Sequence, residues 1–187
     1  ADVEYAVIRN ISTGTGYQIL NNNIGGNTVS GTTRWTKAGT ANNTFYAIYM
    51  SAVMVSGIPT GTGTLQRNTV NLFDWTNTGN ASWTGIHVEM GNFGVGILNN
   101  GNTIGASSGI DNIVLTNGTT SNTTYPDMTG FFGINFSSWS AVTIRDNVVG
   151  GITTRTSDNA TTACSAFGIA KFKGNGTYTP LNIQNNT

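Results

Sequence analysis

An asparagine recurs five times in this chain inside the same short phrase, and this repetition limits what the chain can fold into. The phrase reads apolar residue, two free positions, Asn, a small or β-branched residue, and then Val or Ile, often followed by Gly. The repeated residues are Asn22, Asn68, Asn102, Asn147 and Asn186. Two extra residues precede Asn102, and the last copy reaches only Thr187. Because repetition over some tens of residues is the signature of stacked-repeat folds, it outranks any single motif.

A second phrase lies between the Asn phrases and reads aromatic, small, aliphatic. Its clearest copies are Tyr46–Ala47–Ile48, Phe132–Gly133–Ile134 and Phe167–Gly168–Ile169. The aliphatic position recurs at residues 7, 48, 86, 134 and 169, so the spacing drifts between 35 and 48 residues. Such drift is typical of a repeat whose strands are fixed and whose loops vary, whereas a helical-hairpin repeat would keep its length.

Within each phrase the apolar pattern is that of a β-strand. In Trp83–Met90 the apolar face carries Ile86, Val88 and Met90, and the other face carries Gly85, His87 and Glu89. In 132–136, two phenylalanines and Ile134 alternate with Gly133 and Asn135. A period of two with aromatic and β-branched residues indicates strands. Gly, Asn, Thr and Ser fill the gaps and favour turns over helix interiors, so helix should be nearly absent.

The two phrases together predict an all-β fold, a right-handed parallel β-helix of about five coils with variable loop excursions. The aromatic phrase forms one strand, and the run into each Asn forms a second, as in Ala141–Ile144 and Pro180–Ile183. A third strand follows in some coils, for example Asn112–Leu115. Stacked copies would place Asn on Asn, and each amide could donate to one coil and accept from another. We therefore expect an internal Asn ladder, because a buried amide without partners would destabilise the fold.

The composition excludes several classes of partner. Eight basic and eight acidic residues cancel, and only 9% of the residues are charged, against about 25% in typical soluble domains. Without a basic stripe, nucleic acid is not expected as a partner. No apolar run is long enough for membrane insertion. We expect residues 1–187 to form a single β-helix segment excised from a longer repeat protein, since solenoids need terminal caps and no capping helix is visible.

The phrases resemble repeats of large secreted surface proteins of the Bacteroidetes. The resemblance is carried by Asn102–Thr103–Ile104–Gly105, Phe132–Gly133–Ile134 and Ile183–Gln184–Asn185–Asn186–Thr187, and it is clearest from Trp83 onward. It implies a right-handed parallel β-helix of the pectate-lyase type and a location outside the cell or on its surface. It also implies export by the type IX secretion route. The resemblance specifies an architecture and a compartment, but no activity.

Polysaccharide-active β-helices need clustered carboxylates, with a basic partner or Ca²⁺. The acidic residues here are scattered along the chain and do not form a cluster: Asp2, Glu4, Asp74, Glu89, Asp111, Asp127, Asp146 and Asp158. His87 is the single histidine and cannot build a metal site or a triad alone. We therefore predict no catalytic residues, no cofactor and no metal.

Four tryptophans recur near turns and strand starts: Trp35, Trp75, Trp83 and Trp139. If exposed, they could stack on sugar rings; the alternative is that they fill wide corners of the coils. The loops Gly105–Ile110 and Asn117–Met128 would carry any recognition, as loops on rigid scaffolds often do.

The sequence thus predicts a non-enzymatic structural or adhesive segment of a secreted or cell-surface bacterial protein. Its expected partners are neighbouring repeats of the same protein, the secretion machinery and surface polysaccharide. The alternative is a segment of a polysaccharide lyase or glycoside hydrolase whose catalytic residues lie outside residues 1–187.

Overall fold

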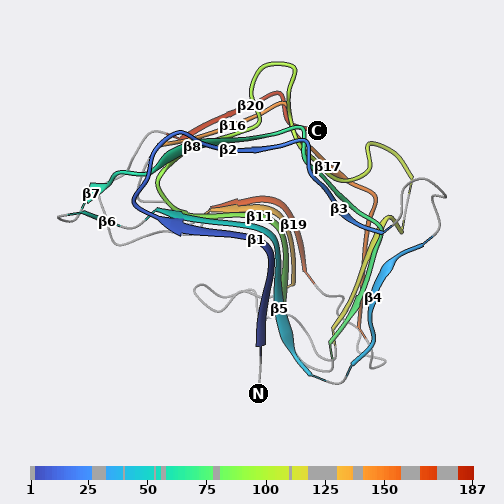
Figure 1. The fold of residues 1–187 in the computed structure, drawn as a ribbon. Coiled ribbons are helices and arrows are strands. Elements are labelled where there is room, and N and C mark those ends of the chain that lie inside the picture. Colours follow the sequence, from blue (N-terminus) through green and yellow to red (C-terminus); the bar gives the residue numbers. More distant parts are fainter. Residues whose placement is uncertain are drawn as a thin grey trace.

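In a computed structural model, the chain forms four parallel β-sheets, and each sheet is built from strands of successive turns of the chain (Figure 1). The structure describes residues 3–26, 33–39, 41–52, 54–55, 58–77, 81–109, 111–117, 130–136, 141–156, 165–171 and 181–187. None of these residues is helical. The prediction of an all-β chain with parallel strands is confirmed, and the arrangement is that of a parallel β-solenoid.

Two of the sheets contain five strands each. Sheet A consists of β1 (Val3–Ser12), β5 (Asn43–Ala52), β11 (Ser82–Met90), β15 (Gly130–Phe136) and β19 (Ala166–Lys171). Sheet B consists of β2 (Tyr17–Leu20), β8 (Thr62–Gln66), β12 (Asn92–Val95), β16 (Val142–Arg145) and β20 (Leu181–Gln184).

The other two parallel sheets contain four strands each. Sheet C consists of β3 (Asn23–Gly25), β9 (Thr69–Asn71), β13 (Thr103–Gly105) and β17 (Val148–Gly150). Sheet D consists of β4 (Trp35–Lys37), β10 (Phe73–Thr76), β14 (Ile113–Asn117) and β18 (Ile152–Thr156). A small antiparallel pair, β6 (Met54–Val55) with β7 (Ile58–Pro59), stands apart from them.

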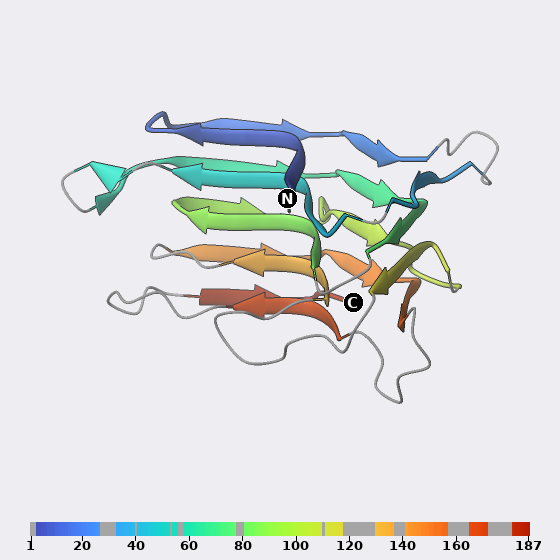
Figure 2. The ribbon, with the colours of Figure 1, turned by 90° about the horizontal axis from the view of Figure 1, so that it is seen from below.

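The chain passes through sheets A, B, C and D in turn and then begins the next rung, a rung being one such passage (Figure 2). Corresponding positions of four copies of the aromatic phrase lie in register, since Ile48, Ile86, Ile134 and Ile169 are paired across sheet A. In the first rung the prediction of residue 7 is wrong by one position, because Ile8 is the partner of Ile48. The sequence predicted the strands of sheets A and B and part of sheet D. It did not predict the short strand that follows each repeated Asn and builds sheet C.

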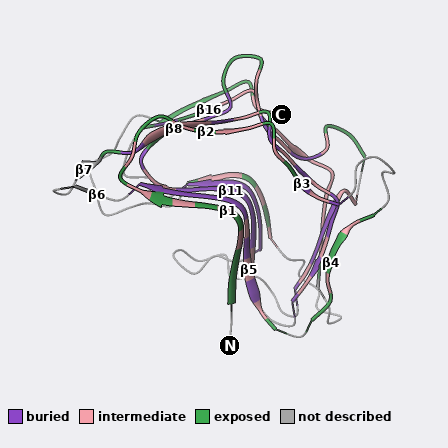
Figure 3. Ribbon diagram, in the orientation of Figure 1, coloured by how far each residue is buried: buried purple, intermediate pink, exposed green. Residues whose placement is uncertain are grey.

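The interior contains a column of aromatic rings. Phe45, Trp83 and Phe131 occupy successive rungs of sheet A and are at most 2% exposed. The centroids of neighbouring rings are 5.3 Å apart, and their planes differ by 23° and 13°. Because the rungs are in register, large apolar groups stack on one another along the solenoid. Figure 3 shows the buried residues in purple, for example along β5 and β11.

Sheet A bends in the middle of its strands. The rings of Tyr46 and Tyr49 lie 5.2 Å apart on the same face, whereas strict alternation would place residues three apart on opposite faces. A Cβ on Gly85 would lie 2.9 Å from the Ile104 side chain, so Gly85 faces the interior at the bend. The alternation predicted for Trp83–Met90 is therefore wrong at Gly85, because the bend interrupts the period of two.

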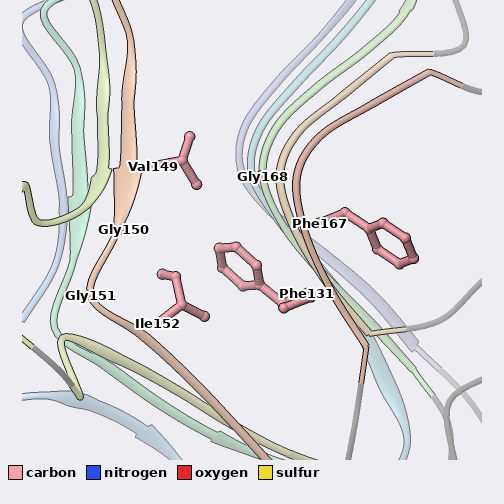
Figure 4. A pocket seen from close by; sticks show the side chains of 8 residues that line it. Phe131, Val149, Gly150, Gly151, Ile152, Phe167 and Gly168 are labelled. Atoms are coloured by element: carbon pink, nitrogen blue, oxygen red, sulfur yellow. The ribbon is translucent and has the colours of Figure 1, made fainter. Parts of the chain in front are cut away.

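The same bend changes the position of Phe132. Its ring stacks on the ring of Phe167 at 5.1 Å with an angle of 8°, and Phe167 lies on the opposite side of sheet A from Phe131 (Figure 4). Phe131, not Phe132, therefore belongs to the interior column. The prediction that Phe132 and Ile134 lie on the same face of the strand is therefore wrong.

Candidate functional site

The repeated asparagines form one row at the corner between sheets B and C, which we call the Asn row. Each side-chain Nδ2 donates to the Oδ1 of the next member at 2.8–2.9 Å: Asn22 to Asn68, Asn68 to Asn102, Asn102 to Asn147, and Asn147 to Asn186. The three middle members are at most 1% exposed. The row is therefore a buried chain of amides whose donors all point the same way.

The other hydrogen bonds of the row connect it to the backbone. Asn102 Nδ2 also donates to the carbonyl of Leu65 at 2.8 Å, and Asn102 Oδ1 accepts the backbone N–H of Asn68 at 3.1 Å. In four of the five copies, the residue before the repeated Asn has a positive φ between 52° and 57°. These residues are Asn21, Arg67, Asp146 and Asn185. The corner thus turns its chain inward, so that the Asn amide can reach its backbone partners.

A second, shorter row of asparagines was not predicted from the sequence. Asn77 Nδ2 donates to Asn117 Oδ1 at 3.1 Å, at the end of sheet D, and both residues are fully buried. Lys37 Nζ donates to Asn77 Oδ1 at 3.0 Å from the preceding rung. Burial lowers the pKa of the Lys37 ammonium. The shared phrase apolar–Thr–Asn, in Trp75–Thr76–Asn77 and Leu115–Thr116–Asn117, is the signal that could have identified this row.

Two of the three tryptophans that the structure describes lie in the interior. Trp83 is 0% exposed and Trp75 is 8% exposed, and both belong to the hydrophobic core. Sugar contact at these two residues is therefore corrected to core packing, because their rings fill the interior. Trp35, in the first rung, is 44% exposed. Trp139 and most of the predicted loop Asn117–Met128 lie outside the described residues.

Polar and aromatic side chains gather instead on the outer face of sheet A at its bend, in a group that we call the outer cluster: Arg9, Tyr46, Tyr49, His87 and Glu89. The Arg9 guanidinium lies 4.9 Å from the Tyr49 ring centroid. The His87 ring stacks on Tyr49 at 5.2 Å and lies 5.1 Å from Tyr46. The Tyr49 hydroxyl donates to Glu89 Oε2, and Arg9 pairs with Glu4. Planar groups of successive rungs therefore stack on this outer face too.

Burial controls the protonation of the outer cluster. It lowers the pKa of the His87 imidazole to about 4, although the charge of Glu89 acts in the opposite direction. Burial, followed by the hydrogen bond to Glu89, raises the pKa of the Tyr49 hydroxyl, and burial raises the pKa of Tyr46 to about 12. The imidazole and both hydroxyls are thus neutral near pH 7.

Four buried polar atoms on β11 and β15 have no hydrogen-bond partner: Trp83 Nε1 in the interior, and Thr84 Oγ1, His87 Nδ1 and Asn135 Oδ1. His87 and Asn135 are register partners in neighbouring rungs. His87 was predicted on the outer face, and its stacking on Tyr49 agrees, but the residue is only 8% exposed. Buried polar groups are normally satisfied by protein, ordered water or ligand. The outer cluster therefore adjoins unused hydrogen-bonding capacity.

Four of the described carboxylates already have polar partners. Glu4 and Glu89 are bound as described above, Asp111 lies 3.5 Å from Arg155, and Asp146 lies 3.6 Å from Arg145. Asp146 also accepts the backbone N–H of Asn99 at 2.7 Å. Among the residues that the structure describes, no group of His, Cys, Asp and Glu could hold a metal ion. The same part of the chain contains no helix long and apolar enough to cross a membrane.

A hollow of about 270 Å³ opens at the end of the solenoid where the last rung lies (Figure 4). The side chains of Phe131, Val149 and Ile152 point into it, and the exposed residues Ala166 and Gly168 border it. It lies between sheet A on one side and sheets C and D on the other. Its apolar lining can hold an apolar group but offers no side chain for chemistry.

Comparison of the chain with protein-family models, with curated proteins and with solved structures finds no match. The function must therefore be argued from the Asn row and the outer cluster.

Proposed function

We propose that the chain is a non-enzymatic structural or adhesive segment of a secreted or cell-surface bacterial protein. Its parallel sheets would be the faces of a right-handed β-helix of about five coils with an internal Asn ladder. Right-handed crossing is the strong rule for parallel strands in one sheet. Repeats like those of Bacteroidetes surface proteins and export by type IX secretion belong to this proposal, as do neighbouring repeats and the secretion machinery as partners.

The observation that supports a structural role best is the unbroken Asn row. Its side-chain bonds join Asn22 to Asn186 through every member between them. The interior ring column and the parallel backbone ladders of the sheets run in the same direction. A scaffold with all three systems along one axis resists bending, because bending would separate groups that bond only to the next rung. Stiffness of this kind suits a rod that holds other surfaces at a distance.

An adhesive role is supported by the outer cluster and not by the buried Trp75 and Trp83. Aromatic faces beside hydrogen-bonding atoms suit the apolar faces and hydroxyls of a sugar. The partly exposed Tyr46 supplies a ring, and the exposed Arg9 and the partly exposed Glu89 supply polar groups beside it. We place the contact with surface polysaccharide on this face. The bound state of Glu89 and the neutral His87 favour recognition over cleavage.

Binding and cleavage of purified polysaccharides test this proposal together. We expect retention on at least one neutral polysaccharide, no new reducing ends and no unsaturated products absorbing in the ultraviolet. Tyr46→Ala should weaken the retention, while Gln18→Ala, on the exposed face of β2, should leave it unchanged.

Cleavage of a polysaccharide by the purified chain would overturn the non-enzymatic assignment and favour the lyase or hydrolase alternative. Retention that Tyr46→Ala leaves unchanged would reject the outer cluster as the adhesive face. Failure to bind any polysaccharide would leave only the structural role, which depends on stiffness and can be measured by bending single molecules of tandemly joined copies.

A further inference from the structure

Lys37 shares a column of sheet D with two residues of the hydrophobic core. Its register partner in the next rung is Trp75, and the partner of Trp75 is Leu115. These two residues are 8% and 0% exposed. A lysine at this position is unexpected for packing alone, because an aliphatic side chain would be buried without removing a charge from water. The amino group therefore needs a specific explanation.

The amino group of Lys37 reaches one fully buried carboxamide. Nζ donates to Asn77 Oδ1 at 3.0 Å, and Asn77 is 0% exposed. Because a C=O bond is about 1.2 Å long, Nζ lies within about 4.2 Å of the Asn77 Cγ atom. Atoms that are placed to react lie about 3–3.5 Å apart. A small movement of the lysine side chain therefore brings the nitrogen to the carbonyl carbon.

Three backbone carbonyls hold the amino group beside Asn77. They belong to Gly39, Ala41 and Thr76, and each accepts a hydrogen bond from Nζ. Gly39 and Ala41 are exposed, so water can replace the amino group at their carbonyls. Thr76 is partly buried and would keep a partner if Nζ retained a single N–H. The site therefore tolerates the loss of the other N–H donors.

The Asn77 carboxamide is fixed at both of its polar atoms. Oδ1 also accepts the backbone N–H of the buried Asn43 at 3.1 Å. Nδ2 donates to Asn117 Oδ1 at 3.1 Å. The Asn43 N–H draws electrons away from Cγ, and it would stabilise a negative charge on Oδ1 as a donor of an oxyanion hole does. Asn77 is therefore positioned as an electrophile.

Burial favours the reactive form of the lysine. It lowers the pKa of the Lys37 ammonium, so the neutral amine forms more readily than in an exposed lysine. The neutral amine is the nucleophilic form of this side chain. A nucleophile, an electrophilic carbon and an oxyanion donor thus lie together at one end of β4 and β10.

We propose that Lys37 and Asn77 form an intramolecular isopeptide bond, which joins the first rung to the second. Nζ attacks Cγ, and the electron pair of the carbonyl moves onto Oδ1. A proton then passes from Nζ to Nδ2. The pair on Oδ1 restores the carbonyl, and the Cγ–Nδ2 bond breaks with its electrons leaving on ammonia. One amine and one primary amide become one secondary amide and one ammonia, so the step needs no oxidant or reductant.

The bond would add a covalent link to rungs that are otherwise joined by hydrogen bonds and packing. It closes a loop between residues 40 positions apart, and a cross-link of this kind stabilises a fold mainly by restricting the unfolded chain. The inference does not depend on polysaccharide binding, because neither side chain belongs to the outer cluster.

Mass spectrometry of the whole chain, folded first and then denatured, tests the bond directly. The chain should be lighter than its sequence mass by one ammonia. Trypsin should no longer cleave after Lys37, and a cross-linked product should contain both Lys37 and Asn77. Fragment ions of that product should place the link between these two side chains.

Two variants identify the amine. Lys37→Met removes the nucleophile, keeps an apolar stem and should restore the full mass. Lys171→Met, at an exposed position of β19, is the matched control and should still lack one ammonia. The peptide map of the unaltered chain decides the question even if Lys37→Met fails to fold.

Full mass of the unaltered chain together with normal cleavage after Lys37 would overturn the proposal. Lys37 would then be an ammonium held by its oxygen acceptors and nothing more. A loss of ammonia that persists in Lys37→Met would overturn it too, because it would come from another reaction, such as succinimide formation at Asn100–Gly101.

Discussion

At the scale of single residues, Asn102 shows how one buried side chain connects three rungs. Its amide bonds to Leu65 and Asn68 in the rung before and to Asn147 in the rung after, at 2.8 Å in each side-chain contact. Asn102 is also only 1% exposed. Any replacement that removes the amide therefore leaves several buried partners without a bond.

Asn102→Leu should lower the free energy of unfolding by about 3 kcal/mol or more, because each buried polar group left unsatisfied costs about 1–3 kcal/mol. The measurement is chemical denaturation followed by circular dichroism. Asn182→Ala, at an exposed position of β20, is the matched control and should change stability by less than about 0.5 kcal/mol. Equal effects of the two substitutions would contradict the stabilising role of the Asn row.

His87 gives the fold a pH dependence whose sign follows from burial. Its pKa falls from 6.5 to about 4 on folding, so between these values the unfolded chain binds more protons. Stability is full above about pH 6.5 and decreases as the pH falls toward 4, by about 3 kcal/mol in total from this group. His87→Gln should abolish this part of the decrease, while all other titrating groups remain common to both proteins. Denaturation midpoints that fall in parallel for both proteins from pH 7 to 4 would refute the argument.

At the scale of elements, the interior face of sheet A leaves no room for a side chain at Gly133. A Cβ on Gly133 would lie 2.4 Å from the Val149 side chain and 2.6 Å from the Gly168 carbonyl, whereas a Cβ on Gly168 would meet nothing within 4 Å. Gly133→Ala should therefore destabilise the fold by about 1–3 kcal/mol through overpacking. Gly168→Ala, at the same position of the next rung, should have little effect. Thermal unfolding of the two variants tests the difference, and similar melting temperatures would count against it.

The strands and their parallel stacking could be predicted because the information is local and repeated. The pattern within each phrase predicts a strand. The repetition of the phrase predicts which strands lie beside one another in a sheet. The bend could not be predicted in this way, since the period-two rule contains no turn inside a strand. The period-two rule predicted Gly85 on the outer face of sheet A and Phe132 on the interior face. In the structure, Gly85 faces the interior and Phe132 lies on the outer face.

The candidate site was less predictable than the fold, because it depends on contacts between rungs. Tyr49 meets Glu89 across 40 positions of sequence, and neither residue is unusual in its own phrase. Trp83 and Trp35 look alike in the sequence, yet Trp83 continues the column of Phe45 inside and Trp35 lies in the first rung with its ring half-exposed. Tryptophan as a residue type suggested sugar contact. Whether each tryptophan is buried depends on its position in the stack of rungs, which its own phrase does not show.

At the scale of the whole molecule, each rung depends on its neighbours for burial. The inner position of sheet B is 0% exposed at Leu65, Val95 and Ile144, but Ile183, in the last rung of the same column, is 47% exposed. In the first rung, Tyr5 and Val7 are 49% and 42% exposed. Stability in such a fold is approximately a sum of nearest-neighbour terms, so the outer rungs have fewer terms than the middle ones.

Native-state hydrogen exchange should reveal this gradient. Amides of β11 and β12, which have paired strands on both sides, should exchange only through global unfolding, whereas those of β1, β19 and β20 should exchange through local opening at lower free energy. Mass spectrometry of peptides from each rung gives the order directly. Asn102→Leu should reduce the protection of the middle rungs most, because it removes bonds on both sides of its own rung. Uniform protection along the axis would show that the solenoid opens as one unit and would contradict nearest-neighbour stability.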